Sequence, residues 1–152
     1  MISLRKGMLT LLLAGLAGFA PWAHAAAVDP KADVAEDKVV YHVNDSDAQA
    51  MNALRNVGNQ LEVNPKAHIV IVTHAGGVDF LMKGAKDKNG GEYAPRVAEL
   101  KLQGVQFDVC SITLRNRKLD KSQFISEVTF VPSGVAEITR LQQREGYAYL
   151  RP

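Results

Sequence analysis

The sequence predicts an α/β fold, namely a three-layer sandwich around a mostly parallel sheet of five strands. Short apolar runs alternate with stretches in which apolar residues recur at helical spacing, and this alternation continues from residue 37 to residue 150. One apolar run, at residues 69–72, is unbroken, which is typical of a parallel strand buried on both faces. The helical stretches between the strands are long enough for the crossovers that parallel pairing requires.

Each predicted element has its own local signals. The predicted strands are residues 37–44, 67–77, 105–109, 127–133 and 147–150, the last as an edge strand. The predicted helices are residues 46–61, 78–85, 94–104, 111–118 and 133–146. Asp45 or Ser46 is a suitable N-cap for the first helix, and Asn64-Pro65 ends it. The last helix has Ser133 as its N-cap and Gly146 at its end.

Residues 1–25 have the three parts of a cleaved export signal. Arg5 and Lys6 precede an apolar run at about residues 8–20, and Ala23-His24-Ala25 provides the small-x-small pattern of a cleavage site. The apolar run is shorter than the ~20 residues that a membrane-spanning helix needs. We therefore expect export to the periplasm, with no membrane attachment after cleavage.

The rest of the chain is expected to form a flexible leader at residues 26–36 and a single domain at residues 37–152. The signal contains two bases and no acid, so its removal from a chain with 18 basic and 16 acidic residues leaves equal numbers of both. A nucleic-acid partner needs a clustered basic surface, and the mature sequence has no basic cluster beyond residues 115–121. The charge pattern therefore argues against nucleic acid.

Cys110 is the only cysteine in the sequence. In an oxidising compartment cysteines usually pair, so a single cysteine is buried, bonds to another molecule or reacts. Cys110 lies between a predicted strand and a predicted helix, where this architecture binds its ligands. Free N–H groups at the helix N-terminus favour the thiolate, and Arg115, one turn into the helix, adds positive potential. A buried thiol that acts as a small hydrophobic residue is the alternative.

His74 is the natural partner of Cys110, because it ends what should be a neighbouring strand. A Cys–His pair permits nucleophilic catalysis or proton shuttling. It also offers two ligands to copper or zinc, but no third ligand stands at a suitable spacing, so we predict no metal site. The alternative for His74 is a loop histidine that bonds to nearby backbone. His42 and His68 are expected to be structural.

Gly76-Gly77 follows His74 but lacks the spacing of a dinucleotide-binding or P-loop motif. It is therefore expected to permit a tight turn or a close backbone approach. The loop after the first strand contains Asp45 and Asp47, which would repel the phosphate of a flavin. We expect the protein to work without a cofactor.

Three segments, "VTHAGGVDFL", "GVQFDVCSITLRNRKL" and "VPSGVAEITRLQQREGYAYLRP", resemble the DsrE/DsrF-like family of sulfur-relay proteins, in particular its exported small single-domain branch. The resemblance runs in order through residues 38–152. It implies a flavodoxin-like sheet and a homo-oligomer, either a trimer or a hexamer. It also implies that Cys110 carries sulfur as a persulfide, and that His74, Gly76 and Gly77 help to form the pocket around that sulfur.

Three functions follow as hypotheses. The first is an exported sulfur carrier or sulfurtransferase that takes sulfane sulfur from a donor onto Cys110 and passes it to an acceptor thiol. Ser111, which stands where related chains often carry an amide residue, and Arg115 are expected to bind the substrate. The second is a non-catalytic oligomeric module that binds a small ligand. The third is a redox or metal-handling protein that uses Cys110 with His74.

Overall fold

The computed structural model of the protein describes residues 36–152. The predicted export signal and almost all of the predicted leader lie outside the described residues. Within residues 36–152, no helix combines the length and the apolar character needed to cross a membrane.

Strands and α-helices alternate along the described chain. They are β1 (Lys38–Asp45), α1 (Ser46–Val63), β2 (His68–Gly76), α2 (Ala94–Leu102), β3 (Gln106–Cys110), α3 (Ser111–Arg117), β4 (Val128–Val131), α4 (Gly134–Glu145) and β5 (Ala148–Leu150). All five strands pair in parallel, in the order β4-β3-β2-β1-β5. The predicted flavodoxin-like α/β sandwich with five strands is therefore confirmed, and its sheet is wholly parallel.

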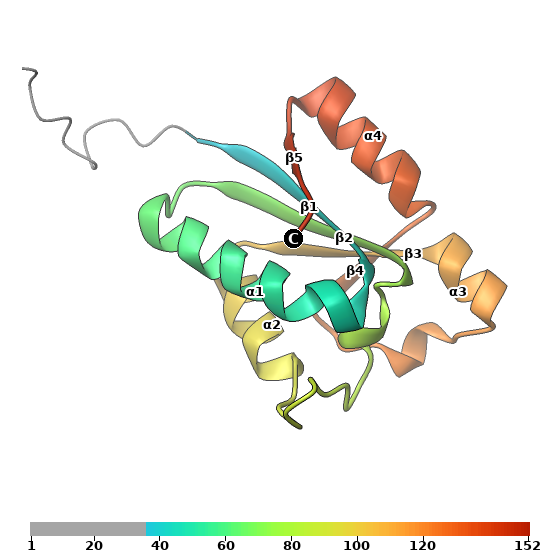
Figure 1. Cartoon of the computed structure of the whole chain (residues 1–152). Coiled ribbons are helices and arrows are strands. Elements are labelled where there is room, and N and C mark those ends of the chain that lie inside the picture. Colours follow the sequence, from blue (N-terminus) through green and yellow to red (C-terminus); the bar gives the residue numbers. More distant parts are fainter. Residues whose placement is uncertain (1–35) are drawn as a thin grey trace, which may run out of the picture.

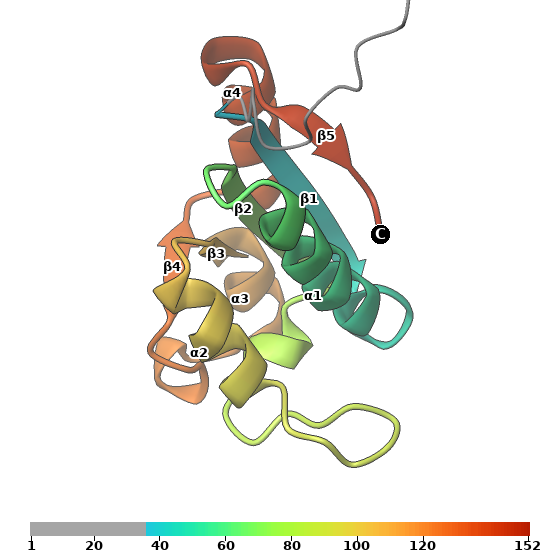
Figure 2. The ribbon, with the colours of Figure 1, turned by 90° about the vertical axis from the view of Figure 1, so that its left-hand side faces the viewer.

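The strand order explains how the helices are distributed over the two faces. The chain builds the sheet outward from β1 to β4 and then returns across it to place β5 beside β1. Because parallel crossovers are right-handed, a reversal of direction puts the returning helix on the opposite face. Accordingly α4 covers one face, and α1 and α2 cover the other (Figure 1). Figure 2 shows α1 and α2 side by side in front of the strands.

Alternating side chains of the strands fill two cores. In β1, Val39 and Tyr41 join the larger core under α1 and α2, whereas Val40 joins the smaller core under α4. Residues 69–72 of β2 are at most 5% exposed, as predicted for a strand covered on both faces. The same alternation puts the side chains of His42, His74 and Cys110 on the α4 side of the sheet.

Two local predictions differ from the structure. The helix predicted at residues 78–85 is wrong: the chain forms only a 3-10 turn, η1 (Asp79–Leu81). Met82 is already extended and Gly84 has a φ of 73°, so the helical hydrogen bonds end at that point. Leu81 is fully buried, and its burial against the larger core produced the apolar pattern. A second 3-10 turn, η2 (Lys121–Gln123), was not predicted.

The helix boundaries follow the predicted caps. Asp45 accepts a hydrogen bond from the Ala48 N–H and is the N-cap of α1, and Asn64 is the C-cap of that helix. Ser133 accepts from the Ala136 N–H at the start of α4, and Gly146 ends α4 with a φ of 75°.

Candidate functional site around Cys110

Cys110 is the last residue of β3 and the N-cap residue of α3. It is 4% exposed and lies on the sheet face that α4 covers. Cys110 pairs with Val131 of β4, and Gly134 at the start of α4 lies against the Cβ atom of Cys110. Cys110 therefore lies among β3, the first turn of α3 and the first turn of α4.

Four polar groups near Cys110 Sγ lower the pKa of the thiol. They are the backbone N–H groups of Gly134, Thr113 and Ile112, together with the Thr113 hydroxyl. Burial raises the pKa of the thiol, but these donors lower it by more, so the pKa of Cys110 lies below its ordinary value. The N–H groups in the first turn of a helix have no partner within that helix. In α3 they act on Sγ as dipoles, because Cys110 makes no side-chain capping hydrogen bond. The site therefore favours the thiolate, which is the nucleophilic form.

Gly134 allows α4 to approach the thiol closely. A Cβ atom at this position would lie 3.2 Å from Thr73 O and 3.3 Å from the Cβ atoms of both Cys110 and His74. Those neighbours are backbone and Cβ atoms, which cannot rotate away. The absence of a side chain at Gly134 thus lets the N-terminus of α4 come close to Cys110, where the Gly134 N–H lowers the pKa of the thiol.

Thr113 joins Cys110 to the loop after β2. Its hydroxyl oxygen accepts from the Ala75 N–H at 2.9 Å, and the same hydroxyl lowers the pKa of Cys110. Ala75 has a φ of 51°, in the left-handed region that residues with a Cβ rarely adopt. Arg117 donates to Ala75 O at 3.0 Å and forms an ion pair with Asp79 at 2.7 Å. Thus α3 fixes this loop at two points.

His74 lies beside Cys110 in the sheet, but its imidazole bonds to another histidine. His74 Nε2 is 2.6 Å from His42 Nε2, and the two rings are stacked with their centroids 4.8 Å apart. His42 Nδ1 is in turn 2.7 Å from the Tyr149 hydroxyl. The structure therefore extends the predicted Cys–His neighbourhood into a hydrogen-bonded chain from β2 through β1 to β5. His42, which we expected to be structural, is the central member.

Both histidines of this chain favour the neutral form. Burial, followed by the charges of His74 and Arg151, lowers the pKa of His42. Burial also lowers the pKa of His74. Since the ordinary value for histidine is about 6.5, both imidazoles are neutral at pH 7. One Nε2 then carries a hydrogen and donates it to the other.

The remaining residues predicted from sequence occupy two different places. Ser111 is half-buried directly after Cys110, and Arg115 is exposed on α3. Gly76 and Gly77 contact the end of β1 instead: Gly76 O accepts from the Ser46 hydroxyl at 2.8 Å. A Cβ atom on Gly77 would lie 2.1 Å from Val43 O, so this position tolerates only glycine. The expected close approach of backbone is therefore confirmed at Gly77.

Thr113, Gly134, His42 and Tyr149 contribute to the site without having been selected from the sequence. Their residue types are common in ordinary packing, and they are far from Cys110 along the chain, apart from Thr113. The placement of Pro132-Ser133-Gly134 after a strand was the only sequence signal for Gly134. Strand order and register, which bring β4, β3, β2, β1 and β5 together, decide the rest.

Asp108 is a buried carboxyl group on the same side of β3 as Cys110. It is fully buried; Gln106 Nε2 donates to its Oδ1 at 2.8 Å, and its Oδ2 has no hydrogen-bond partner among the described residues. Burial raises the pKa of Asp108 to about 6, with the Gln106 hydrogen bond acting in the opposite direction. Glu137 and Arg140 of α4 add smaller, opposing electrostatic effects. The carboxyl is therefore partly protonated in weakly acidic solution.

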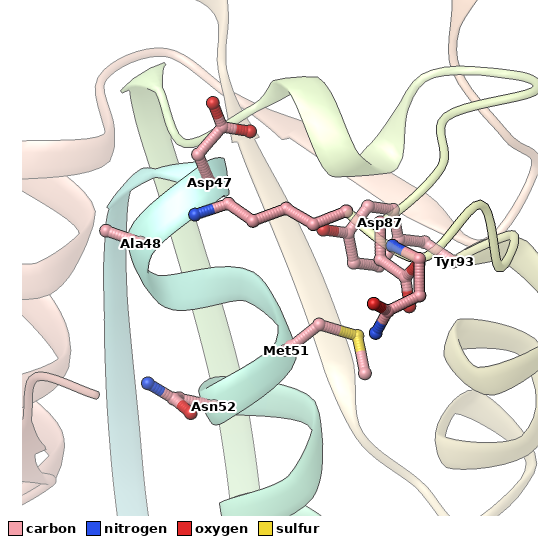
Figure 3. Close-up of a pocket in the computed structure, with 8 residues that line it drawn as sticks. Asp47, Ala48, Met51, Asn52, Asp87 and Tyr93 are labelled. Atoms are coloured by element: carbon pink, nitrogen blue, oxygen red, sulfur yellow. The ribbon is translucent and has the colours of Figure 1, made fainter.

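A separate pocket of about 250 Å³ lies between the start of α1 and the loop that precedes α2 (Figure 3). Asp47 and Met51 of α1 face it, as do Asp87 and Tyr93. Asp87 Oδ1 accepts from the Asn89 and Gly91 N–H groups and so holds the loop closed. Since Cys110 and His74 do not line this pocket, we do not assign the cysteine chemistry to it.

No group of three or more His, Cys, Asp or Glu side chains in residues 36–152 is arranged to hold a metal ion. The imidazole of His74 is directed to His42. One of the two candidate metal ligands therefore has another hydrogen-bond partner.

The model of the DsrE/DsrF-like family matches residues 38–152, which include every strand and helix described above. The chain belongs to the DsrE/DsrF-like family. No curated protein matches this DsrE/DsrF-like chain.

Two solved structures share its fold. The "protein of unknown function MTH1491" from Methanobacterium thermoautotrophicum is 35% identical, with a TM-score of 0.68 over 76% of this chain and 99% of that one. The ychN protein from E. coli is 17% identical, with a TM-score of 0.64 over the same shares, 76% and 99%. Both chains therefore correspond in length to the domain described here.

Proposed function

We propose that this DsrE/DsrF-like protein is an exported sulfur carrier that holds sulfane sulfur as a persulfide on Cys110. The observation that carries the proposal is the position of Cys110 at the end of β3 and the start of α3, where three N–H groups and one hydroxyl lower the pKa of its thiol. These donors stabilise negative charge on sulfur before and after transfer. Membership of the family supports sulfur relay at the level of the family.

The loading step needs only a thiolate and a sulfane-sulfur donor. Cys110 Sγ attacks the outer sulfur of thiosulfate or of a polysulfide, a new S–S bond forms, and the donor's own S–S bond breaks. Its electron pair leaves with sulfite or with the shortened polysulfide. Because Cys110 is 4% exposed, we expect small donors of this kind to load it more readily than bulky ones.

The direct test is the intact mass of the folded mature protein after exposure to polysulfide or thiosulfate. We expect an adduct of ~32 Da, or a multiple of it, that a reductant removes. The reductant step is needed because two added oxygens have the same nominal mass and are not removed in this way. Cys110→Ser is the matched control and should show no adduct.

An absent adduct, together with a thiol that resists alkylation in the folded protein, would exclude a carrier role for Cys110. The burial of Cys110 gives a specific reason to keep the second candidate, a non-catalytic module that binds a small ligand. In that case Cys110→Ser would leave ligand affinity nearly unchanged. The carrier proposal requires the same substitution to abolish all sulfur transfer.

Export is part of the proposal and rests on residues 1–25. Cell fractionation and the N-terminal sequence of the mature protein test it. We expect periplasmic material that begins at Ala26. Cytoplasmic protein that retains residues 1–25 would contradict export and would leave the chemistry of Cys110 unaffected.

A further inference from the structure

The hydrogen-bonded histidine pair has no role in loading Cys110, yet it lies next to the cysteine. His74 and Cys110 occupy neighbouring strands on the α4 face, and both Cβ atoms would touch a side chain at Gly134. The imidazole of His74 is bonded to His42, and His74 is not among the groups that shift the pKa of Cys110, so the pair does not serve to ionise Cys110. A group that handles a proton beside this sulfur is instead placed for a second reactant.

We propose that His74 is the general base that deprotonates the acceptor thiol, and that His42 and Tyr149 are positioning residues that conduct the proton to solvent. This inference rests on the proposed sulfur-carrier function. It adds the class of acceptor, a thiol that arrives protonated, and a route for its proton.

The geometry defines a continuous route. When His42 Nδ1–H donates to the Tyr149 oxygen and His74 Nε2–H donates to His42 Nε2, His74 Nδ1 keeps a free lone pair. A proton that arrives at His74 Nδ1 can then move along the chain by exchange of hydrogen bonds. Tyr149 is 40% exposed on the edge strand β5, so the route ends at solvent.

The charges around His42 and His74 keep the two imidazoles unprotonated and so able to accept a proton. Arg151 is the cation that acts on His42, and its guanidinium donates to Asn44 Oδ1 at 3.3 Å. No carboxylate is among the groups that shift the pKa of His42 or His74 within the described residues. The two imidazoles therefore have no acidic partner that would hold them protonated at pH 7.

The transfer step balances without an external oxidant or reductant. The acceptor thiol gives its proton to His74, and its sulfur attacks the outer sulfur of the Cys110 persulfide. The S–S bond to Cys110 breaks, its electron pair stays on Sγ, and the acceptor leaves as a new persulfide. The N–H groups of Gly134, Thr113 and Ile112 stabilise the negative charge that returns to Sγ.

A comparison of two acceptor thiols distinguishes a general-base role of His74 from a structural role. An alkyl thiol is largely protonated at pH 7 and needs a base, whereas an aryl thiol is largely ionised and does not. The protein is first loaded and its persulfide is quantified by mass. The loss of that persulfide is then followed with each thiol for the wild type and for His74→Ala, His42→Gln and Tyr149→Phe.

We expect His74→Ala to slow transfer to the alkyl thiol by ~100-fold and to leave the aryl thiol nearly unaffected. His42→Gln and Tyr149→Phe should slow only the alkyl reaction, by ~5–10-fold, because each interrupts the route but leaves the base. His68→Ala is the matched histidine control, since His68 is exposed at the opposite end of β2. It should behave as the wild type.

Equal slowing of sulfur transfer to both thiols in His74→Ala would show a structural role for His74 and would overturn the inference. Unchanged transfer rates with both thiols would also overturn it. A wild type that cannot be loaded would instead overturn the proposed function, and the two failures are distinguished by the loading step. NMR titration gives an independent readout: His42 and His74 should titrate as a coupled pair, below the ordinary pKa of histidine. Independent titration of His42 and His74 would contradict the hydrogen-bonded route from His74 to Tyr149.

Discussion

At Cys110, burial and hydrogen bonding act on the same thiol in opposite directions. Burial alone would raise its pKa and make it an inert core residue. The N–H groups of Gly134, Thr113 and Ile112 and the Thr113 hydroxyl reverse this effect. A buried cysteine is therefore compatible with a reactive one here.

Thr113 allows this balance to be tested. We expect Thr113→Val, which keeps the shape but removes the hydroxyl, to raise the pKa of Cys110 and to shift the pH midpoint of thiol alkylation upward. It should also lower stability by about 1–2 kcal/mol, because the Ala75 N–H loses its acceptor. Alkylation rates between pH 6 and 10 and thermal unfolding measure the two effects.

Thr113→Ser is the matched control for that substitution. It keeps the hydroxyl, so we expect its alkylation profile to follow the wild type. An unchanged alkylation midpoint in Thr113→Val would mean that the hydroxyl does not act on the thiol.

Asp108 gives a prediction for pH and stability. Its pKa rises from the ordinary 3.8 to about 6 on folding, so the folded state binds this proton more tightly than the unfolded state. The stabilising contribution of the protonated carboxyl is therefore present below pH 4 and is lost as pH rises to about 6. We expect Asp108→Asn to be about 1–3 kcal/mol more stable than the wild type at pH 8, with a smaller difference at pH 4.

Denaturant unfolding of both proteins from pH 4 to pH 8 measures this difference. A constant offset between the two curves would show that Asp108 does not titrate differently in the folded state. An Asn variant that is less stable at pH 8 would contradict the predicted sign.

At the scale of elements, the β2 end depends on a close contact with β1. Gly77 lies where a Cβ atom would be 2.1 Å from Val43 O, and backbone cannot move aside. We therefore expect Gly77→Ala to destabilise the protein by more than ~3 kcal/mol. Unfolding in denaturant gives the value.

Gly76→Ala is the neighbouring control. A Cβ atom there would meet Asn44 O at 3.6 Å, an ordinary contact, so the loss should stay below ~1 kcal/mol. Similar losses for both substitutions would show that the loop, rather than the contact with Val43, limits stability.

The elements also show where sequence patterns succeed. Caps at Asp45, Ser133 and Gly146 are local, because each acts within one turn of its own residue. Ser133 and Gly146 were predicted, and Asp45 was one of two predicted candidates. The prediction of a helix at residues 78–85 was wrong because the apolar residues there do not mark a helix face. Phe80 and Leu81 belong to a short 3-10 turn and pack it against the larger core.

At the scale of the whole molecule, several apolar side chains remain exposed on the described chain. Ile112, Val135 and Leu150 are each at least 38% exposed, and they lie on α3, α4 and β5. Together with the oligomer that the family resemblance implies, they support our proposal of a homo-trimer or homo-hexamer. Light scattering of the mature protein should give three or six times the chain mass, and a monomer at micromolar concentration would contradict it.

The sequence by itself determined the alternation of strands and helices, the family and the position of Cys110 between a strand and a helix. These follow from local periodicity, capping residues and one ordered pattern over residues 38–152. The tertiary structure decided which groups meet the sulfur and where the imidazole of His74 points. Gly134 lies 24 positions beyond Cys110, and Tyr149 lies 107 positions beyond His42. Such contacts depend on strand order and register, which nothing local in the chain encodes.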